Sequence, residues 1–121
     1  MDVRGYRELV AWQKAMDLVV LVYMATQSWP REELYVLTAQ IRRAAVSVPS
    51  NIAEGHGRAS TGEYISHIGI AYGSLMEVET QVAIAERLGY VPAETMLSIR
   101  VLSSEVGRLL NGLKASLARR N

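Results

Sequence analysis

The 121-residue chain contains no cysteine and no phenylalanine, and only three prolines. The absence of cysteine excludes disulfides, thiol chemistry and metal sites with cysteine ligands, and it is compatible with a reducing compartment. Without phenylalanine, the aromatic side chains are six Tyr and two Trp. Any binding chemistry therefore has to come from charged, polar or aliphatic side chains and from these few aromatic rings.

Long apolar runs and an excess of charge of one sign are also missing. The longest purely apolar run, Leu18 to Ala25, is far shorter than the roughly 20 residues that a membrane span requires. The first residues, MDVRGYRELV, contain no apolar segment after a basic start, so we expect no signal peptide and a cytoplasmic protein without membrane partners. A net charge of +1 is too balanced to predict nucleic-acid binding by itself, so such a role requires clustered basic residues.

The composition is otherwise that of a folded protein. Half of the residues are apolar and 21% are charged. The length fits one domain with one core, so we predict a single domain over residues 1–121. Most of the basic residues are Arg, whose guanidinium suits bidentate contacts to phosphate or carboxylate.

Apolar residues recur at helical spacing in four segments, and no strand pattern occurs. The first segment ends near Gln27 and has an apolar stripe at Leu9, Trp12, Met16, Val19 and Tyr23. The second begins near Arg31 and has its stripe at Leu34, Leu37, Ile41, Ala45, Val48 and Ile52. The third opens with a capping box from Ser60 to Glu63 and continues through Ile68, Tyr72, Leu75, Val78 and Val82. The fourth follows Pro92, with Ile99, Leu102, Val106, Leu109, Leu113 and Leu117.

Proline interrupts the second segment without changing its phase. The apolar stripe keeps its spacing of three and four residues across Pro49, where a loop would have reset it. We therefore predict one long helix that is kinked at Pro49, because proline removes a backbone donor and crowds the preceding turn. Gly55 and Gly57 are expected to end this helix.

Short connections between the four segments favour antiparallel neighbours. We therefore predict an all-α protein, an antiparallel up-down-up-down four-helix bundle. The fourth segment has a broader apolar stripe than one seam requires, since Val101 and Leu110 are apolar as well. Two interpretations stay open: a well-buried helix of the core, or a face that contacts another copy.

Catalytic or metal-binding constellations are not visible. A di-iron bundle requires Glu-x-x-His twice, but His67 follows Glu63 by four residues and His56 lies in a glycine-rich turn. The serines lie in helical segments without a nucleophile elbow, and GHGR lacks the spacing and the Lys of a phosphate-binding loop. We therefore expect no enzyme activity, no catalytic residues, no metal and no cofactor.

The stretch RRAAVSVPSNIAEGHGR, from Arg42 to Arg58, contains the most unusual combination of residues. In one interpretation it is structural: Arg42 pairs with Glu77 or Glu79 across the bundle, and Asn51 satisfies the backbone near the kink. In the other, its arginines contact phosphate or a partner. Asn51, Glu54 and Arg58 recur at helical spacing and form one polar strip beside the apolar stripe.

These residues resemble the bacterial four-helix-bundle family first known from proteins encoded in intervening sequences of 23S ribosomal RNA genes. The resemblance extends from Tyr6 to about Leu113 and includes YRELVAWQKAMDL, SWPREELYVLTAQIRRAAVSVPSNIAEGHGR, GEYISHIGIAYGSLMEVE and LGYVP. It implies a structural signature at Pro49, Asn51, Glu54, Gly55, Glu77 and Glu79. Related proteins accompany the reverse transcriptases of diversity-generating retroelements.

The resemblance implies a function without catalysis. Members of the family form ring-shaped pentamers, and their proposed role is to bind RNA or another nucleic acid. For this chain we therefore expect a homo-oligomeric accessory protein that binds RNA or DNA through an Arg-rich surface. The candidate contacts are Arg42, Arg43 and Arg58, with Lys14 and Arg31 as possible additions. The alternative is a protein-interaction adaptor for a larger enzyme such as a reverse transcriptase.

Overall fold

The computed structural model describes residues 5–120 and contains four long helices. These helices are α1 (Val10–Thr26), α2 (Leu37–His56), α3 (Thr61–Arg87) and α4 (Ala93–Ala118). Two single 3-10 turns, η1 (Tyr6–Glu8) and η2 (Arg31–Glu33), precede α1 and α2. No strand occurs within residues 5–120, so the predicted all-α class is confirmed.

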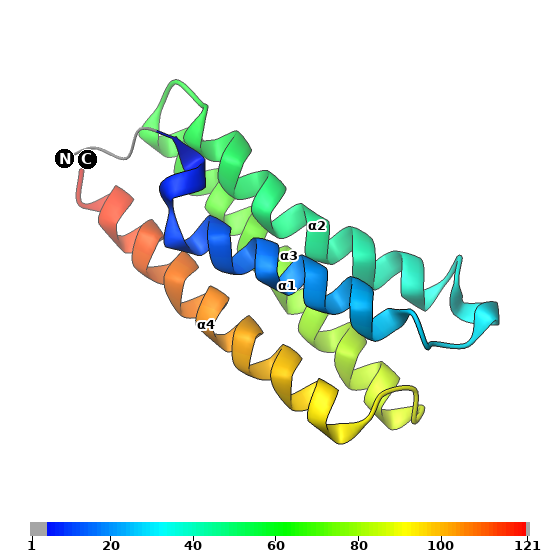
Figure 1. The fold of residues 1–121 in the computed structure, drawn as a ribbon. Helices are drawn as coiled ribbons and strands as arrows, with labels where there is room; N and C mark the ends of the chain where they lie inside the picture. Colours follow the sequence, from blue (N-terminus) through cyan, green and yellow to red (C-terminus); the bar gives the residue numbers. More distant parts are fainter. Residues whose placement is uncertain (1–4, 121) are drawn as a thin grey trace.

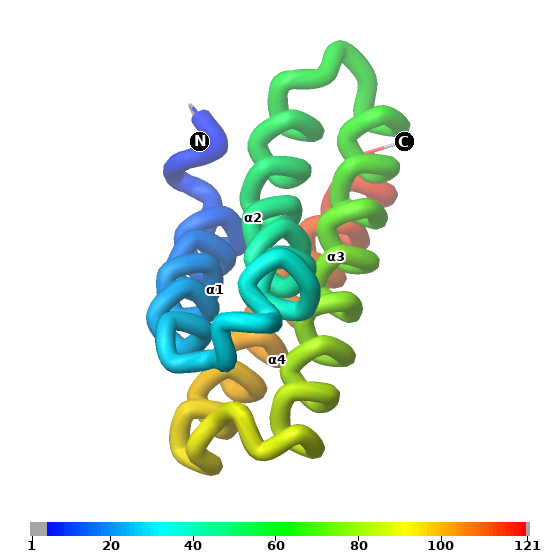
Figure 2. Tube along the Cα trace, turned by 90° about the vertical axis from the view of Figure 1, so that its right-hand side faces the viewer, coloured from blue at the N-terminus to red at the C-terminus, as the bar shows by residue number. Residues whose placement is uncertain are grey.

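The helices form an antiparallel bundle in which each helix contacts the two that adjoin it (Figure 1). The order around the bundle is α1, α2, α3, α4, and α4 returns to α1; the α2–α3 contact is the most extensive. Viewed from the side, successive helices alternate in direction (Figure 2). The predicted up-down-up-down arrangement is therefore confirmed. η1, the α2–α3 turn and the end of α4 lie at one end of the bundle, and the other two connections lie at the opposite end (Figure 1).

Helix α2 continues through Pro49 without interruption, as predicted from the unbroken apolar stripe. Leu37, Ile41, Ala45, Val48 and Ile52 of that stripe are all buried. The bend expected at Pro49 stays a prediction.

The start of the second helix was predicted too early. Arg31–Glu33 form a 3-10 turn instead, and Val36 has φ −119° and ψ −101°, outside the helical region. Because of this turn, Leu34 does not lie on the buried face of α2, and the Leu34 side chain is 44% exposed. The apolar spacing therefore begins about one turn before the helix itself begins.

The predicted core face of the first helix was also wrong in phase. The buried residues of α1 are Ala11, Ala15, Leu18, Val22 and Thr26, which also follow helical spacing. From the predicted stripe, Trp12 and Val19 are only half-buried, and Met16 and Tyr23 are exposed. Small alanines on the inner face allow α1 to lie close to its neighbours, while the larger side chains flank the α1–α2 boundary.

Helix α3 begins and ends with well-formed caps. The Ser60 hydroxyl accepts from the Glu63 amide at 3.1 Å, which confirms the predicted capping position. At its other end, Gly89 adopts φ +74°, and the amides of Gly89 and Tyr90 donate to the carbonyls of Glu86 and Ala85. This is the glycine-dependent Schellman termination. The chain can then reverse within a few residues into α4.

The end of the bundle with η2 is closed by contacts between the two connections. The Tyr90 hydroxyl donates to Glu33 Oε2 at 2.7 Å, and the Tyr90 and Trp29 rings lie 5.9 Å apart. The hydrogen bond to the carboxylate raises the pKa of Tyr90, because it favours the protonated phenol. These contacts join the α1–α2 and α3–α4 connections.

Gly55 permits a close approach between the last turn of α2 and the first turns of α3. A Cβ at residue 55 would lie 2.7 Å from the Cβ of His67 and 3.0 Å from Cδ1 of Tyr64. Neither distance is compatible with an ordinary van der Waals contact. Glycine is therefore required here by interhelical packing rather than by backbone conformation.

Replacing Gly55 by alanine should destabilise the fold. We expect Gly55→Ala to lower the free energy of unfolding by about 1–3 kcal/mol, because the new methyl group has no space between the helices. Urea unfolding followed by circular dichroism measures this change. Gly73→Ala is the matched control, because open space surrounds Gly73 on the exposed side of α3. It should be neutral or up to about 1 kcal/mol stabilising, since alanine favours helix; equal stability of the two variants would contradict the packing argument.

Candidate nucleic-acid interface

A chain of hydrogen bonds joins α2 to α3 along their closely packed faces. Ser47 and Ser74 share a hydrogen bond of 2.8 Å between their hydroxyls. Asn51 Nδ2 donates to the Ser47 carbonyl at 2.9 Å and to its hydroxyl at 3.0 Å, while Asn51 Oδ1 lies 3.0 Å from Nδ1 of His67. Asn51 therefore donates to a backbone carbonyl two residues before Pro49, and not to the Ala45 carbonyl, which is the one that loses its donor to the proline.

Glu54 continues this polar chain toward the surface. Its carboxylate forms an ion pair with Arg58 and lies 3.8 Å from His67 Nε2. The polar strip of Asn51, Glu54 and Arg58 that the sequence predicts is thus present. Because Arg58 already has a carboxylate partner, any phosphate would have to compete with Glu54 for it.

Arg42 is held within the protein by α1. Its Nε donates to the Thr26 hydroxyl at 2.9 Å, and its guanidinium carbon lies 4.7 Å from the centre of the Tyr23 ring. The predicted pairing of Arg42 with Glu77 or Glu79 is wrong: within residues 5–120, Arg42 forms no ion pair with either carboxylate. Glu79 instead accepts from the Ser103 hydroxyl at 2.6 Å, and Glu77 has no ion pair within residues 5–120.

The five predicted basic residues do not form one surface on a single copy. Arg42 and Arg43 lie on α2, Lys14 pairs with Glu105 of α4 at 3.7 Å, and Arg31 and Arg58 belong to connections at opposite ends of the bundle. Arg31 and Arg43 are exposed and have no ion pair or hydrogen-bonding partner for their side chains among the described residues. Of the five predicted residues, these two are the most available to a ligand.

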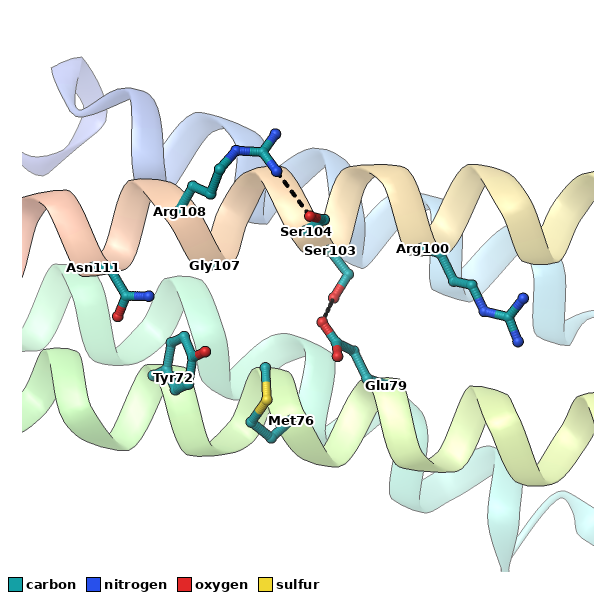
Figure 3. A pocket seen from close by; sticks show the side chains of 9 residues that line it. All are labelled: Tyr72, Met76, Glu79, Arg100, Ser103, Ser104, Gly107, Arg108 and Asn111. Carbon is teal, nitrogen blue, oxygen red and sulfur yellow. Dashed lines mark hydrogen bonds between the residues drawn. The ribbon is translucent and has the colours of Figure 1, made fainter.

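A groove between α3 and α4 presents a second group of polar and basic side chains (Figure 3). On α4, Arg100, Ser104, Arg108 and Asn111 follow one another at helical spacing along its rim. Arg108 donates to the Ser104 hydroxyl at 2.8 Å, and Arg100 pairs with Glu86 of α3. The remaining lining residues are Tyr72, Met76, Glu79, Ser103 and Gly107.

Gly107 of α4 is one of the residues that line this groove. It is buried, and a Cβ there would lie 3.4 Å from Leu75 Cδ2 and 3.8 Å from Tyr72 Cε1. Both distances are ordinary van der Waals contacts, so a methyl group would fit at residue 107. Arg100 and Arg108 line the groove with longer side chains, which phosphate oxygens could contact.

Helix α4 and the residues directly after it carry an excess of positive charge. The basic residues are Arg100, Arg108, Lys114, Arg119 and Arg120, and the acidic ones are Glu94 and Glu105. Burial raises the pKa of Tyr64 and the positive charge of Arg120 opposes this rise, so Arg120 acts on the first turns of α3. Basic side chains thus extend from the groove to the end of the bundle where Arg58 lies.

Sequence reasoning missed the α4 residues because it concentrated on the adjacent pair Arg42 and Arg43. The signal that could have found them is the spacing of Arg100, Ser104, Arg108 and Asn111, which places four polar side chains on one side of a helix.

No group of three His, Asp or Glu side chains suited to a metal ion occurs within residues 5–120. No helix among these residues is long and apolar enough to cross a membrane.

Comparison with known proteins connects this arrangement to a family. The 23S rRNA-intervening sequence proteins match residues 7–112, which confirms the resemblance seen in the sequence. The fold is similar to the crystal structure of a protein with unknown function from the S23 ribosomal protein family of Bacteroides thetaiotaomicron. The two chains are 25% identical, with a TM-score of 0.80, and the similarity covers 88% of this chain and 96% of that one. No curated protein matches the chain.

The hydrogen bonds of Asn51 should make a measurable contribution to stability. We expect Asn51→Ala to lower the free energy of unfolding by about 1–3 kcal/mol, because it leaves Nδ1 of the half-buried His67 without a partner and removes two hydrogen bonds to Ser47. Gln13→Ala is the control: it removes one exposed hydrogen bond, to the Arg7 carbonyl, and should change stability by less than about 0.5 kcal/mol. Thermal and urea unfolding of both variants provide the comparison, and an Asn51 variant as stable as the control would contradict the structural role.

Proposed function

The chain belongs to the 23S rRNA-intervening sequence protein family, and from this we propose that it is a non-enzymatic, homo-oligomeric accessory protein that binds RNA or another nucleic acid. The observation that carries the proposal is the basic side of α4. Arg100 and Arg108 lie at the rim of a groove, and Lys114, Arg119 and Arg120 continue toward the end of the bundle. Cationic side chains in such a row match the repeated negative charge of a phosphate backbone.

The distribution of charge supports this proposal more than its total does. The net charge of the whole chain is only +1, but α4 and the residues directly after it contain five basic and two acidic side chains. Arginine suits phosphate because its planar guanidinium donates to two oxygens at once. Tyr72 and Asn111 in the same groove add a ring for stacking and an amide for hydrogen bonding to bases.

Assembly into a ring would multiply these contacts. In a cyclic oligomer the basic side of α4 is repeated in every copy with the same orientation. The pentameric state that the family resemblance implies is part of this proposal, as is a cytoplasmic location. A nucleic acid that follows the ring would then meet several equivalent basic sides.

The second candidate function is a protein-interaction adaptor, and exposed apolar side chains favour it. Leu34, Tyr35 and Val36 follow one another on the surface, and the Tyr35 side chain is 88% exposed. Consecutive exposed apolar residues are costly unless another surface covers them. A larger enzyme, such as a reverse transcriptase, would be a suitable protein partner for an adaptor of this kind.

Salt-dependent binding of labelled RNA tests the nucleic-acid function. We expect binding that weakens steeply with salt, because each phosphate that the protein neutralises releases counterions. Arg108→Ala combined with Lys114→Ala should reduce the slope of log K against log salt by about 1.4 for single strands, or about 1.8 for duplex DNA. Fluorescence anisotropy at several salt concentrations measures the slope.

Two control variants define the outcome of this titration. Arg87→Ala removes a charge at the opposite end of the bundle, from a residue that is not among the candidate contacts, and should leave the slope unchanged. Arg43→Ala combined with Arg58→Ala tests the contacts that the sequence predicted, and an unchanged slope would remove those two residues from the site. If RNA and DNA fail to bind even at low salt, the nucleic-acid function is wrong and the adaptor becomes the better candidate.

A further inference from the structure

An apolar groove runs along the boundary between α1 and α2, on a different side of the bundle from the basic side of α4. Its apolar lining comes from both helices and from the preceding 3-10 turn: Tyr6, Trp12, Met16, Val19, Val46, Pro49 and Ala53. Met16 and Val46 are 39% and 40% exposed. Toward the η2 end, a second hollow shares Val46 and adds Tyr23, Arg42 and Arg43. The two hollows together are called the α1–α2 groove below.

A narrow exposed strip on α4 has chemistry that complements this groove. Glu94, Leu97 and Val101 are spaced three and four residues apart, so their side chains share one side of the helix. Leu97 and Val101 are 62% and 61% exposed, although they are aliphatic. The Glu94 carboxylate has no ion pair within residues 5–120. These three residues are called the α4 strip.

Contacts to α1 show that the strip and the groove lie at the same level along the bundle. Arg42 of α2 bonds to Thr26 near one end of α1, and Lys14 near the other end of α1 pairs with Glu105 of α4. α2 and α4 run in the same direction, and all helices rise by about 1.5 Å per residue. Arg43 and Glu94 therefore lie at similar heights, and Val101 lies near the height of Pro49.

We propose that the α4 strip of one copy docks into the α1–α2 groove of a second copy of this chain. Leu97 and Val101 would contact the apolar lining near Val46 and Pro49, and Glu94 would pair with Arg43. This inference rests on the self-assembly included in the proposed function, and it specifies the surfaces that form the contact.

Charge and register favour a second copy over another partner. Arg43 in the groove and Glu94 in the strip are both exposed, have opposite charges and have no ion pair within a single copy. Two copies that point in the same direction bring them together without any shift along the bundle. Because the strip and the groove lie on different sides of the molecule, the contact is heterologous, and repeated contacts can close into a ring.

Sedimentation velocity of the purified full-length protein over a range of concentrations tests the interface. Val46→Glu and Val101→Glu should each raise the dissociation constant for self-association at least about tenfold, because each places a charge in the apolar contact. Ile84→Glu is the control: Ile84 is 42% exposed on α3, away from both surfaces, and its replacement should leave assembly unchanged. Circular dichroism confirms that each variant is folded.

A charge reversal tests the pairing of the strip with the groove. Arg43→Glu and Glu94→Arg should each weaken assembly, and the double variant should restore it toward the wild-type value. If the oligomer resists both glutamate substitutions in the apolar contact, or if the double variant is weaker than either single one, the proposed interface is wrong. A wild type that stays monomeric at all concentrations, or that assembles only with an added protein, also overturns it.

The RNA titration distinguishes this inference from the nucleic-acid function. Val46→Glu leaves the basic side of α4 unchanged, so a monomeric variant still tests phosphate binding. Assembly through the groove without nucleic-acid binding would support the interface and contradict the nucleic-acid function. A monomeric wild type that binds RNA with a steep salt slope would support the nucleic-acid function and contradict the interface.

Discussion

The close approach of α2 to α3 at Gly55 is the constraint on which most of this structure depends. A side chain at that position would meet the Cβ of His67, so the two helices could not keep their present separation. At this separation even the short side chains of Ser47 and Ser74 reach one another. The same small residues that permit dense packing thus also permit the hydrogen bonds that fix the relative positions of the two helices.

This constraint explains the unusual composition of the stretch from Arg42 to Arg58. Its buried or half-buried small residues include Ala44, Ala45, Ser47 and Gly55. Asn51 connects the Ser47 carbonyl to His67. Arg42 is engaged by Thr26, and Arg58 by Glu54. The stretch is therefore mainly a packing element. Within this stretch, Arg43 has the guanidinium most available to a partner, because its side chain has no ion pair within residues 5–120.

Helical periodicity predicts the number, order and direction of the helices, because α2 and α3 each have one clear apolar stripe. In α4, where the apolar stripe is broader, Leu102, Leu109 and Leu113 of the predicted stripe are only half-buried. Periodicity fails in α1, where two stripes of equal spacing lie side by side. Spacing alone does not determine which stripe is buried; side-chain volume does, and the alanines Ala11 and Ala15 allow the closer packing. It also fails at Leu34, where an apolar residue continues the pattern after the helix geometry has ended.

The candidate site was less predictable than the fold, because the availability of a charge depends on tertiary partners. Adjacent arginines are conspicuous in a sequence, yet Arg42 is held by a hydroxyl of another helix. Arg100 and Arg108 are eight residues apart and become one feature only when α4 lies beside α3. The general character of the surface, rich in arginine, could be anticipated, but its location required the packing of the bundle.

The separation of surfaces around the bundle has a physical consequence for a protein of nearly neutral charge. The α2–α3 boundary is occupied by internal hydrogen bonds, the α1–α2 groove is apolar, and the α3–α4 groove carries arginines at its rim. The α4 strip and Arg108 share one side of α4, because Val101, Ser104 and Arg108 are three and four residues apart, so the contact between copies and the arginine rim would lie next to each other. Because each copy has a net charge of only +1, electrostatic repulsion between copies would be small.

A single row of phosphate contacts is weak, but linked copies raise the effective concentration of the next row, so that modest contacts combine into stable binding. A balanced net charge is therefore compatible with nucleic-acid binding when assembly, rather than the charge of one copy, supplies the affinity.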